Sequence, residues 1–326
     1  TPLGLGLEVE QHDVGLTALE RDGVTLTEAT MTRIPEVDGV ILGPVSHYEY
    51  PPRERGGINP SAELRTVFEL YANIRPCLSR VDLSILHRPM DLVIVRENTE
   101  GFYSDRNMYA GSGEFMPDAD TAFSIRKITA AASRRVARVA FDLARKRRRK
   151  VTAVHKANVV KLSDALFLRE VRAVAADYPD VELNELIVDA AAALMIRRPD
   201  DFDVIVTTNM FGDILSDEAS ELSGSLGLGA AINMGDQICV AQAQHGSAPD
   251  IAGKDVANPA SLILSAAMLL RWHSERTQHN DLRRAADAID EAVERVAEGP
   301  HHRTRDLNEG EAGTTQFTEH VVTALT

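Results

Sequence analysis

Two aspartates four residues apart have the clearest capacity for chemistry. Asp213 and Asp217 lie in the segment GDILSDE, which follows an apolar run. If the segment is helical, both carboxylates lie on one face and repel each other unless a cation lies between them. Oxygen-rich sites of this kind suit Mg²⁺ or Mn²⁺. A solvent-facing acidic pair is the alternative, but the preceding strand favours a metal site, because active sites of α/β folds gather at strand carboxyl ends.

Three arginines form a second group. Arg75 lies in YANIRPC, Arg96 ends the run DLVIVRE, and Arg65 precedes both. A guanidinium at a strand end has a planar fork suited to a carboxylate. Each arginine alone is typical of a structural or surface ion pair, whereas all three converging would indicate a polycarboxylate substrate.

Tyr103 and Lys156 each follow an apolar run. A lysine in that place, near a metal or a carboxylate, can act in proton transfer. The alternatives are a surface lysine and a packed tyrosine. The segment HGSAPDIAGKDVANP at 245–259 combines a Gly-rich turn, an aspartate and a helix start. It could bind a nucleotide, although it matches neither GxGxxG nor a phosphate loop.

The elements that must position these residues alternate along the chain, which is typical of an α/β fold. Short β-branched runs predict buried strands at 40–42, 91–95, 151–155 and 203–207. Helices are predicted at 128–145, 164–176, 260–274 and 281–297. Asn258 is expected to cap the third helix, with Pro259 in its first turn. Residues 111–120 are interpreted as a loop or excursion.

The composition is that of a globular protein of about two domains. The 326 residues include 44% apolar residues and carry a net charge of −14, which argues against a general nucleic-acid binder. No apolar run approaches the roughly 18 residues of a membrane span. The basic run RKRRRK at 145–150 indicates either a nuclear or nucleic-acid signal or, as we prefer, a solvated helix end. Cys77 and Cys239 cannot form a disulfide framework and suit the cytoplasm.

Four segments, in this order and spacing, resemble the isocitrate/isopropylmalate dehydrogenases, the metal-dependent β-decarboxylating dehydrogenases. They are DLVIVRENTEGFYS, VTAVHKANVVKLSD, TTNMFGDILSDEAS and HGSAPDIAGKDVANP, and the resemblance runs from about residue 8 to 322. It implies oxidation of the C2 hydroxyl of a 3-substituted malate by hydride transfer to NAD or NADP, followed by loss of the β-carboxylate. The family's N-terminal strand and GDGIGPE loop do not occur in the sequence, and we expect those roughly 30 residues to precede it, because a central strand would otherwise be missing from the sheet.

The resemblance also assigns residues. It implies that Arg65, Arg75 and Arg96 hold the malate carboxylates, and that Asp213 and Asp217 bind the metal together with Asp189 of a second subunit. Lys156 matches the base for the hydroxyl proton, also supplied by the second subunit, and Tyr103 matches the acid that protonates the enolate. The expected assembly is therefore a homodimer with shared active sites. The cofactor residues implied are Ser46, His245, Gly246, Ser247, Ala248, Asp250, Ile251 and Asn258.

Two positions bear on cofactor and substrate choice. Asp250, followed by Ile251, is expected to accept hydrogen bonds from the adenosine ribose and to repel a 2′-phosphate, which predicts NAD. Asn59 and Ser61 lie where the family meets the third malate substituent, and both can donate hydrogen bonds. Leu42 stands where isocitrate enzymes carry lysine, so the pattern is mixed and favours a polar or short substituent. Gln242 replaces a glutamate that is common in relatives.

The resemblance implies an isopropylmalate dehydrogenase-like fold of two domains, with one sheet crossing both. Residues 1–70 and 223–326 would form the large cofactor-binding domain. Residues 71–222 would form the dimerisation and substrate domain, with a dimer arm at about 103–127 and the active site between the domains. A non-catalytic regulatory subunit of a mixed oligomer is the alternative. Retention of Lys156, Tyr103 and the aspartates favours the enzyme.

Overall fold

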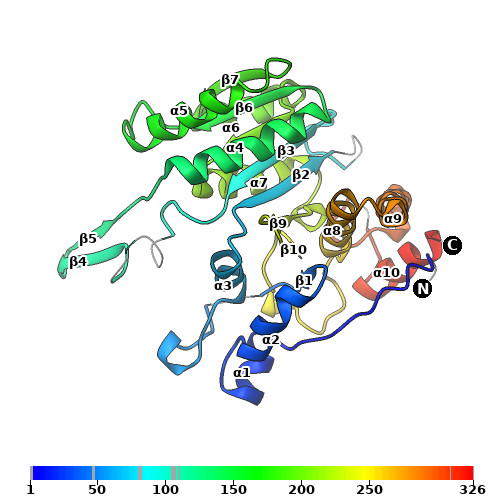
Figure 1. Cartoon of the computed structure of the whole chain (residues 1–326). Helices are drawn as coiled ribbons and strands as arrows, with labels where there is room; N and C mark the ends of the chain where they lie inside the picture. Colours follow the sequence, from blue (N-terminus) through cyan, green and yellow to red (C-terminus); the bar gives the residue numbers. More distant parts are fainter. Residues whose placement is uncertain are drawn as a thin grey trace. The chain divides into compact units, whose positions relative to one another are not determined.

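The computed structural model describes residues 3–45, 48–79, 83–103, 108, 111–308 and 310–325. The chain forms two compact units, one of Leu70–Gly224 and the other of Thr1–Glu69 together with Ser225–Thr326 (Figure 1). Each is described by itself. Among the described residues, no helix has the length and apolar character that crossing a membrane requires.

The unit Leu70–Gly224 is built on five strands in the order β2-β3-β8-β6-β7. β2 (Ala72–Leu78) runs antiparallel to β3 (Asp91–Glu97), and β8 (Val204–Thr207), β6 (Lys150–His155) and β7 (Glu182–Ile187) continue in parallel. The central strands are buried on both faces. This explains their near-continuous apolar sequence.

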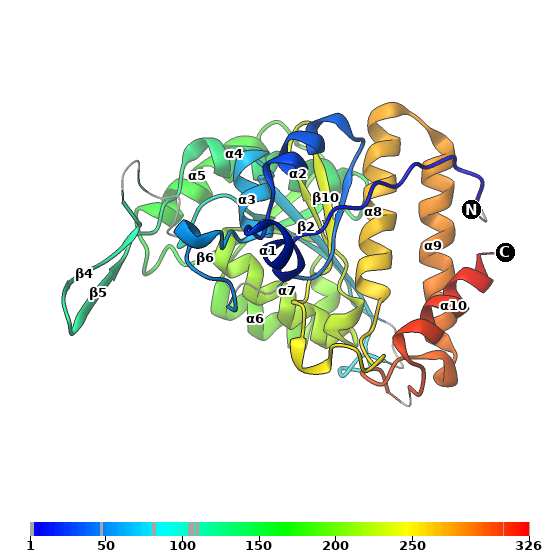
Figure 2. The same cartoon turned by 90° about the horizontal axis from the view of Figure 1, so that it is seen from below.

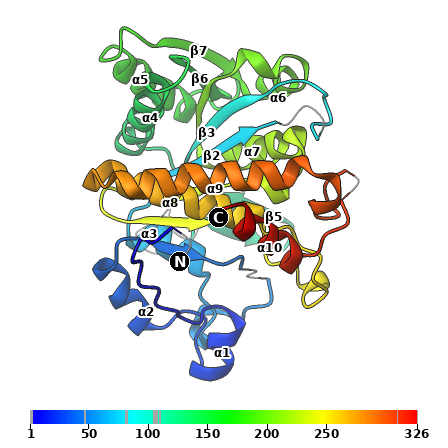
Figure 3. The same ribbon diagram turned by 90° about the vertical axis from the view of Figure 1, so that its right-hand side faces the viewer.

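Helices cover both faces of this sheet. α4 (Ala130–Arg145) and α5 (Ser163–Ala175) lie on one face, and α6 (Val188–Arg197) and α7 (Asn209–Ser223) lie on the other (Figures 2 and 3). Leu92, Ile94, Ile205, Met195 and Leu215 pack between the sheet and the second helix pair. β3 and β8 therefore run through an apolar core. Arg96, near the end of β3, and the polar residues of α7 lie at the edge of this core.

A hairpin extends from this unit between β3 and α4. β4 (Glu114–Asp118) pairs antiparallel with β5 (Thr121–Ser124), and every residue of β4 is exposed. Its base is closed by reciprocal backbone hydrogen bonds between Gly101 and Lys127, both 2.9 Å. Of the two interpretations of 111–120, a loop or an excursion, the structure has an excursion that is paired as a hairpin, with Phe115 stacked on Phe123 across the strands.

The other unit combines a small sheet with helices. β1 (Val40–Leu42) is parallel to β10 (Cys239–Gln242), which is antiparallel to β9 (Ile232–Met234). α8 (Ala260–Thr277) packs against α9 (Asn280–Glu298), and α10 (Thr314–Ala324) lies along α9 (Figure 3). The core between these helices includes Phe317 and Val293. The remaining helices are α1 (Leu16–Asp22), α2 (Glu28–Arg33) and α3 (Pro60–Val67).

The four predicted strands and four predicted helices are all present. Their boundaries differ from the predicted ones by up to three residues, and Pro259 is the N-cap of α8 rather than a residue of its first turn. Asn258 lies one residue earlier still, and its Oδ1 accepts a hydrogen bond from the Ala260 N–H at 3.0 Å. The side chain therefore still satisfies one of the donors at the helix start.

The basic run ends α4, as we preferred. Arg147 Nε donates to Asp203 Oδ1 at 2.8 Å, and the Arg148 N–H donates to Asp203 Oδ2 at 2.9 Å. Asp203 is 1% exposed, so these bonds satisfy a buried carboxylate. The run has a structural role that accounts for its charge. Both cysteines are free and buried, and burial raises the pKa of each thiol, that of Cys77 to about 12.

Candidate active site

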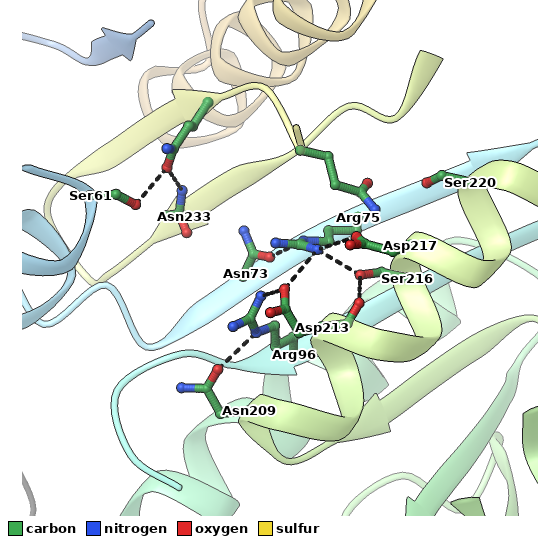
Figure 4. A network of polar contacts seen from close by, with 12 residues as sticks. Ser61, Asn73, Arg75, Arg96, Asn209, Asp213, Ser216, Asp217, Ser220 and Asn233 are labelled. Carbon is green, nitrogen blue, oxygen red and sulfur yellow. Dashed lines mark hydrogen bonds and ion pairs between the residues drawn. The ribbon is translucent and has the colours of Figure 1, made fainter. Parts of the chain in front are cut away.

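A polar cluster stands where β3 ends and α7 begins (Figure 4). At its centre is Arg96, whose side chain is only 2% exposed. Arg96 Nε donates to Asn209 Oδ1 at 2.8 Å, Nη1 donates to Asp213, and Nη2 donates to the Tyr103 hydroxyl at 2.8 Å. The three donors of one planar fork thus fix three side chains, which a lysine could not do.

A glycine allows α7 to approach this arginine. A Cβ at Gly212 would lie 2.7 Å from both Cβ and Cγ of Arg96, which is closer than non-bonded carbon atoms approach in proteins. Gly212 precedes Asp213, so its lack of a side chain brings the helix backbone and the aspartate onto the strand end. The glycine is visible in the sequence as the first residue of GDILSDE. The reason for it, the close approach of α7 to Arg96, becomes visible only in the packing.

Arg75, from the neighbouring strand β2, contacts the same helix face. Its Nη1 donates to Ser216 Oγ at 2.7 Å and lies 3.3 Å from both Asp213 Oδ1 and Asp217 Oδ1. Burial lowers the pKa of Arg75 to about 10, with a further lowering from Arg96 that the two aspartates oppose. Two adjacent buried cations are thus held in place by two carboxylates.

The cluster can bind both anions and a cation. Asp213 and Asp217 share one face of α7, as their spacing predicted, and their side chains are 39% and 52% exposed. These partly exposed carboxylates suit a divalent cation, and the neighbouring guanidinium groups suit substrate carboxylates. Within the described part of the chain, no three His, Cys, Asp or Glu residues gather as a complete metal site. The two aspartates are oxygen ligands of the kind that a divalent cation prefers.

Lys156 and Asp189 form a second group in the same unit. Lys156 follows β6, Asp189 lies in the first turn of α6, and Lys156 Nζ donates to Asp189 Oδ1. This hydrogen bond is the main cause that holds the pKa of Asp189 below its usual value. Among the described residues, neither side chain bonds Asp213 or Asp217. Asp189 is 69% exposed, so the pair is open to solvent or to another molecule.

Tyr103 is hydrogen-bonded within the cluster and is not simply packed. Its hydroxyl accepts from Arg96 and donates to Asp213 Oδ2 at 3.1 Å. The ring also lies under the Arg96 guanidinium, 5.6 Å from its carbon to the ring centroid. The side chain is 37% exposed. A ligand at the aspartates would therefore meet this hydroxyl.

The residues expected at the third substituent lie in the other unit. Asn59 is the N-cap of α3 and accepts from the Ala62 N–H at 3.1 Å. Ser61 donates to Gln242 Oε1 at 2.9 Å, an atom that also accepts from Asn233 at 3.4 Å. Gln242 is thus a buried partner of Ser61. Arg65 lies on α3 of this unit, whereas Arg75 and Arg96 belong to the unit Leu70–Gly224, which brings those two together.

The expected nucleotide segment is an exposed loop after β10. Gly246, Ser247, Ala248 and Asp250 are exposed. Ala248 has a φ of 43°, in the left-handed region, and Pro249–Ile251 form a short 3₁₀ turn that presents Asp250. His245 Nδ1 lies 3.0 Å from the Gly246 carbonyl. Asn258 Nδ2 donates to Asp306 at 3.0 Å, which fixes the end of the loop. Ser46 lies outside the described residues.

Comparisons with known proteins agree with this geometry. Residues 2–321 match the family described as isocitrate/isopropylmalate dehydrogenase. The chain belongs to this family. It is 43% identical over 326 residues to the isocitrate/homoisocitrate dehydrogenase of Thermus thermophilus, covering 99% of this chain and 91% of that protein. It is 40% identical over 299 residues to the 3-isopropylmalate dehydrogenase of Methanothermobacter thermautotrophicus, with 91% and 84% covered.

A solved structure gives the same result. The crystal structure of isocitrate dehydrogenase from Methylococcus capsulatus superimposes with a TM-score of 0.87 at 38% identity, covering 99% of this chain and 92% of that one. The predicted α/β fold of the isocitrate/isopropylmalate dehydrogenases is therefore confirmed. The family comprises metal-dependent decarboxylating dehydrogenases that use a nicotinamide cofactor and act on small hydroxy polycarboxylates.

Three residues of the cluster in this family member were not found from the sequence. Asn73, Asn209 and Ser216 each bond one of the two arginines. Asn73 could have been found, because it lies two residues before Arg75 and so on the same face of a strand. Ser216 lies three residues after Asp213 on the same helical face. Asn209 had no local signal, because its partner Arg96 lies on a separate strand, far away in the sequence.

A buried carboxyl behind the cluster gives a pH-dependent prediction. Glu100 is 3% exposed and accepts from the Thr129 N–H at 2.7 Å and the Thr129 hydroxyl at 2.9 Å. Burial raises its pKa from 4.5 to about 7, and Glu97 adds to the rise. The folded chain therefore holds a proton that the unfolded chain releases. The stability that Glu100 contributes is full below about pH 4.5 and is lost as the pH rises through about 7.

We expect Glu100→Gln to remove this loss. The difference in unfolding free energy between the variant and the wild type should shift in favour of the variant, on the order of 2 kcal/mol, as the pH rises from about 5 to about 8. Urea unfolding at several pH values measures it. Taking the difference between the two proteins cancels the other titrating groups. A difference that does not change with pH would contradict the assignment.

Proposed function

We propose that this chain catalyses the NAD-dependent oxidative decarboxylation of a 3-substituted malate with Mg²⁺ or Mn²⁺. The observation that carries the proposal is the pair of buried arginines, Arg75 and Arg96, beside Asp213 and Asp217. A substrate with two carboxylates and a hydroxyl needs cationic partners for the former and an oxygen-liganded metal near the latter. The cluster offers both within one hydrogen-bonded group.

Each residue has a role in that reaction. Arg75 and Arg96, with Arg65, hold the malate carboxylates, while Asp213 and Asp217, with Asp189 of a second copy, hold the metal. Lys156 of that copy would accept the proton of the C2 hydroxyl, and NAD, when bound, would supply the hydride acceptor. After loss of CO₂, Tyr103 protonates the enolate carbon. When bound, the divalent cation polarises the C2 oxygen.

The partly exposed Lys156–Asp189 pair supports a shared site. Both side chains have polar atoms to contribute, yet they bond each other and not the aspartates of α7. A two-fold homodimer, the commonest soluble assembly, can bring this pair to the cluster of a second copy. We assign dimerisation and the hairpin arm to the unit Leu70–Gly224 and cofactor binding to the other unit. Two free buried cysteines suit a cytoplasmic location.

The third substituent of the substrate is proposed to be polar or short. Asn59 and Ser61 lie on the first turn of α3 with polar side chains. Gln242, which accepts the Ser61 hydrogen bond, is neutral and adds no charge there. An isocitrate-like, tartrate-like or malate-like substrate fits these residues better than a branched apolar chain does, because an apolar group would remove polar side chains from water without offering them a hydrogen bond.

A double replacement tests the choice of NAD. Asp250 is exposed on its 3₁₀ turn, where its carboxylate would repel a 2′-phosphate. We expect Asp250→Lys with Ile251→Tyr to shift the NAD-to-NADP ratio of kcat/KM toward NADP by about 100-fold, since a repulsion becomes an attraction. Steady-state kinetics with both cofactors measure the ratio. An unchanged ratio would mean that Asp250 does not face the ribose.

A substrate panel tests the function itself. NADH formation is followed with isocitrate, isopropylmalate, homoisocitrate, tartrate and malate, and kcat/KM values are compared. We expect turnover by this chain alone, with the polar or short substrates preferred over isopropylmalate. The alternative, a non-catalytic regulatory subunit, predicts turnover with no member of the panel unless a second type of chain is added. A preference for isopropylmalate would contradict the proposed polar or short substituent but not the proposed reaction.

A further inference from the structure

A buried ion pair lies directly behind the proposed base. Arg126 Nη1 pairs with Asp164 Oδ1, and the two side chains are 7% and 0% exposed. Arg126 lies between the hairpin and α4, and Asp164 lies in the first turn of α5. Neither residue belongs to the arginine–aspartate cluster. A buried ion pair is a weak contributor to stability, because desolvation offsets the attraction, so its placement invites another explanation.

The second oxygen of Asp164 provides that explanation. Asp164 Oδ2 accepts a hydrogen bond from the backbone N–H of Lys156 at 2.6 Å. One carboxylate therefore joins the Arg126 guanidinium to the peptide that carries the Lys156 side chain. Lys156 directly follows β6, where no further strand pairing fixes the backbone. The Lys156 carbonyl accepts from the N–H groups of Val159 and Val160, both at 2.9 Å, so Asp164 holds the amide side of this residue and the following turn holds the carbonyl side.

Arg126 is itself held from several elements. Its Nη1 donates to Ser163 Oγ at 3.1 Å, and its Nη2 donates to Thr208 Oγ1, at the start of α7, at 2.9 Å. The guanidinium carbon also lies 5.2 Å from the ring centroid of Phe211. Contacts other than that with Asp164 thus also hold the guanidinium group. A residue that positions another must itself be held in this way.

We propose that Arg126 is a positioning residue for Lys156, acting through Asp164. The inference rests on the proposed role of Lys156 as the base. It also gives the hairpin a link to the reaction, because Arg126 is the second residue after β5 and precedes Lys127, which closes the hairpin base with Gly101. Displacement of the hairpin would move Arg126, and with it the peptide of Lys156.

The test compares Arg126→Met with Arg147→Met. Arg147 also pairs with a buried aspartate of the same unit, Asp203, but it contacts no residue of the proposed site. Both variants should lower the melting temperature. Only Arg126→Met should lower kcat strongly, by about 30-fold with KM changed less than about 3-fold, because a small displacement of a reacting group slows the chemical step more than it weakens binding. A kcat no lower than that of Arg147→Met would overturn the proposal.

A second variant keeps the buried charge. Arg126→Lys retains a cation for Asp164 but loses the fork that also reaches Thr208, so we expect kcat to fall only about 5-fold. It serves as the test if Arg126→Met does not fold. Two results would contradict positioning by the fork. One is a kcat of Arg126→Lys as low as that of an inactive control. The other is a kcat and an amide exchange rate both equal to those of the wild type.

Amide exchange gives a readout that does not need turnover. The Lys156 N–H, bonded to Asp164, should lose hydrogen-exchange protection in Arg126→Met and keep it in Arg147→Met. Equal protection in both variants would overturn the proposal. If the wild-type protein turned over no hydroxy acid, the proposed function would fail, while this comparison would still decide whether Arg126 positions Lys156.

Discussion

Mixing two inactive variants, Lys156→Ala and Asp213→Asn, is expected to restore turnover. Each homodimer lacks a necessary group in both of its sites. In a heterodimer, one site takes Asp213 from the first subunit and Lys156 from the second and is intact, while the other site carries both changes. About half of the wild-type sites per heterodimer should therefore be active, provided that the assembly is a two-fold dimer. The measurement is NADH formation by co-refolded or co-expressed variants that carry different affinity tags.

The matched control mixes Arg96→Met with Asp213→Asn. These two residues bond each other within one chain, so every site of their heterodimer lacks one of them. This mixture should stay inactive. No recovery with the first pair, in a heterodimer of verified composition, would show that each site is complete within one chain. The assignment of Lys156 and Asp189 to the second subunit would then be wrong.

Arg96→Lys is expected to lower kcat/KM by about a thousandfold. The guanidinium donates from three separate nitrogens to Asn209, Asp213 and Tyr103 in a nearly fully buried position. An ammonium group keeps the charge but cannot meet all three acceptors in their planes, and buried polar atoms left without partners each cost about 1–3 kcal/mol. Steady-state kinetics on the preferred substrate measure the loss, with circular dichroism as a check of folding.

Arg172→Lys provides the control for this change. Arg172 also makes a two-pronged contact with a carboxylate of the same unit, Glu185, with both distances 2.6 Å. Its side chain is 58% exposed, and exposed ion pairs contribute about 1 kcal/mol or less. Activity should be unchanged. An Arg96→Lys enzyme within tenfold of wild type would mean that the fork geometry at the end of β3 is not required.

The main elements could be predicted because their signals are local. The runs that became β3 and β8 are apolar throughout, as strands buried on both faces are. The spacing of Asp213 and Asp217 placed both on one face of α7, and the structure confirms that shared face. The run at 145–150 follows the end of α4, as we preferred, but its bonds to the buried Asp203 could not be read from the helix-end rule.

The parts that were missed depend on contacts between distant segments. The hairpin at 114–124 has no buried face, so its sequence lacks the alternation that identifies a half-buried strand. Gln242 had no assigned effect until the structure placed it beside Ser61, which is 181 residues away in the chain. The bond from Asp164 to the peptide of Lys156 involves a backbone atom, whose identity no side-chain pattern reveals.

One measurement tests the central claim most directly, namely the stoichiometry of products in the presence and absence of metal. Metal-free protein is prepared with a chelator, and NADH and CO₂ are measured together on the preferred substrate before and after Mg²⁺ or Mn²⁺ is added. We predict no turnover without the metal, recovery on its addition, and equal amounts of NADH and CO₂, since Asp213 and Asp217 are two partly exposed carboxylates suited to a cation. Full activity in excess chelator, or NADH without CO₂, would contradict metal-dependent oxidative decarboxylation by this chain.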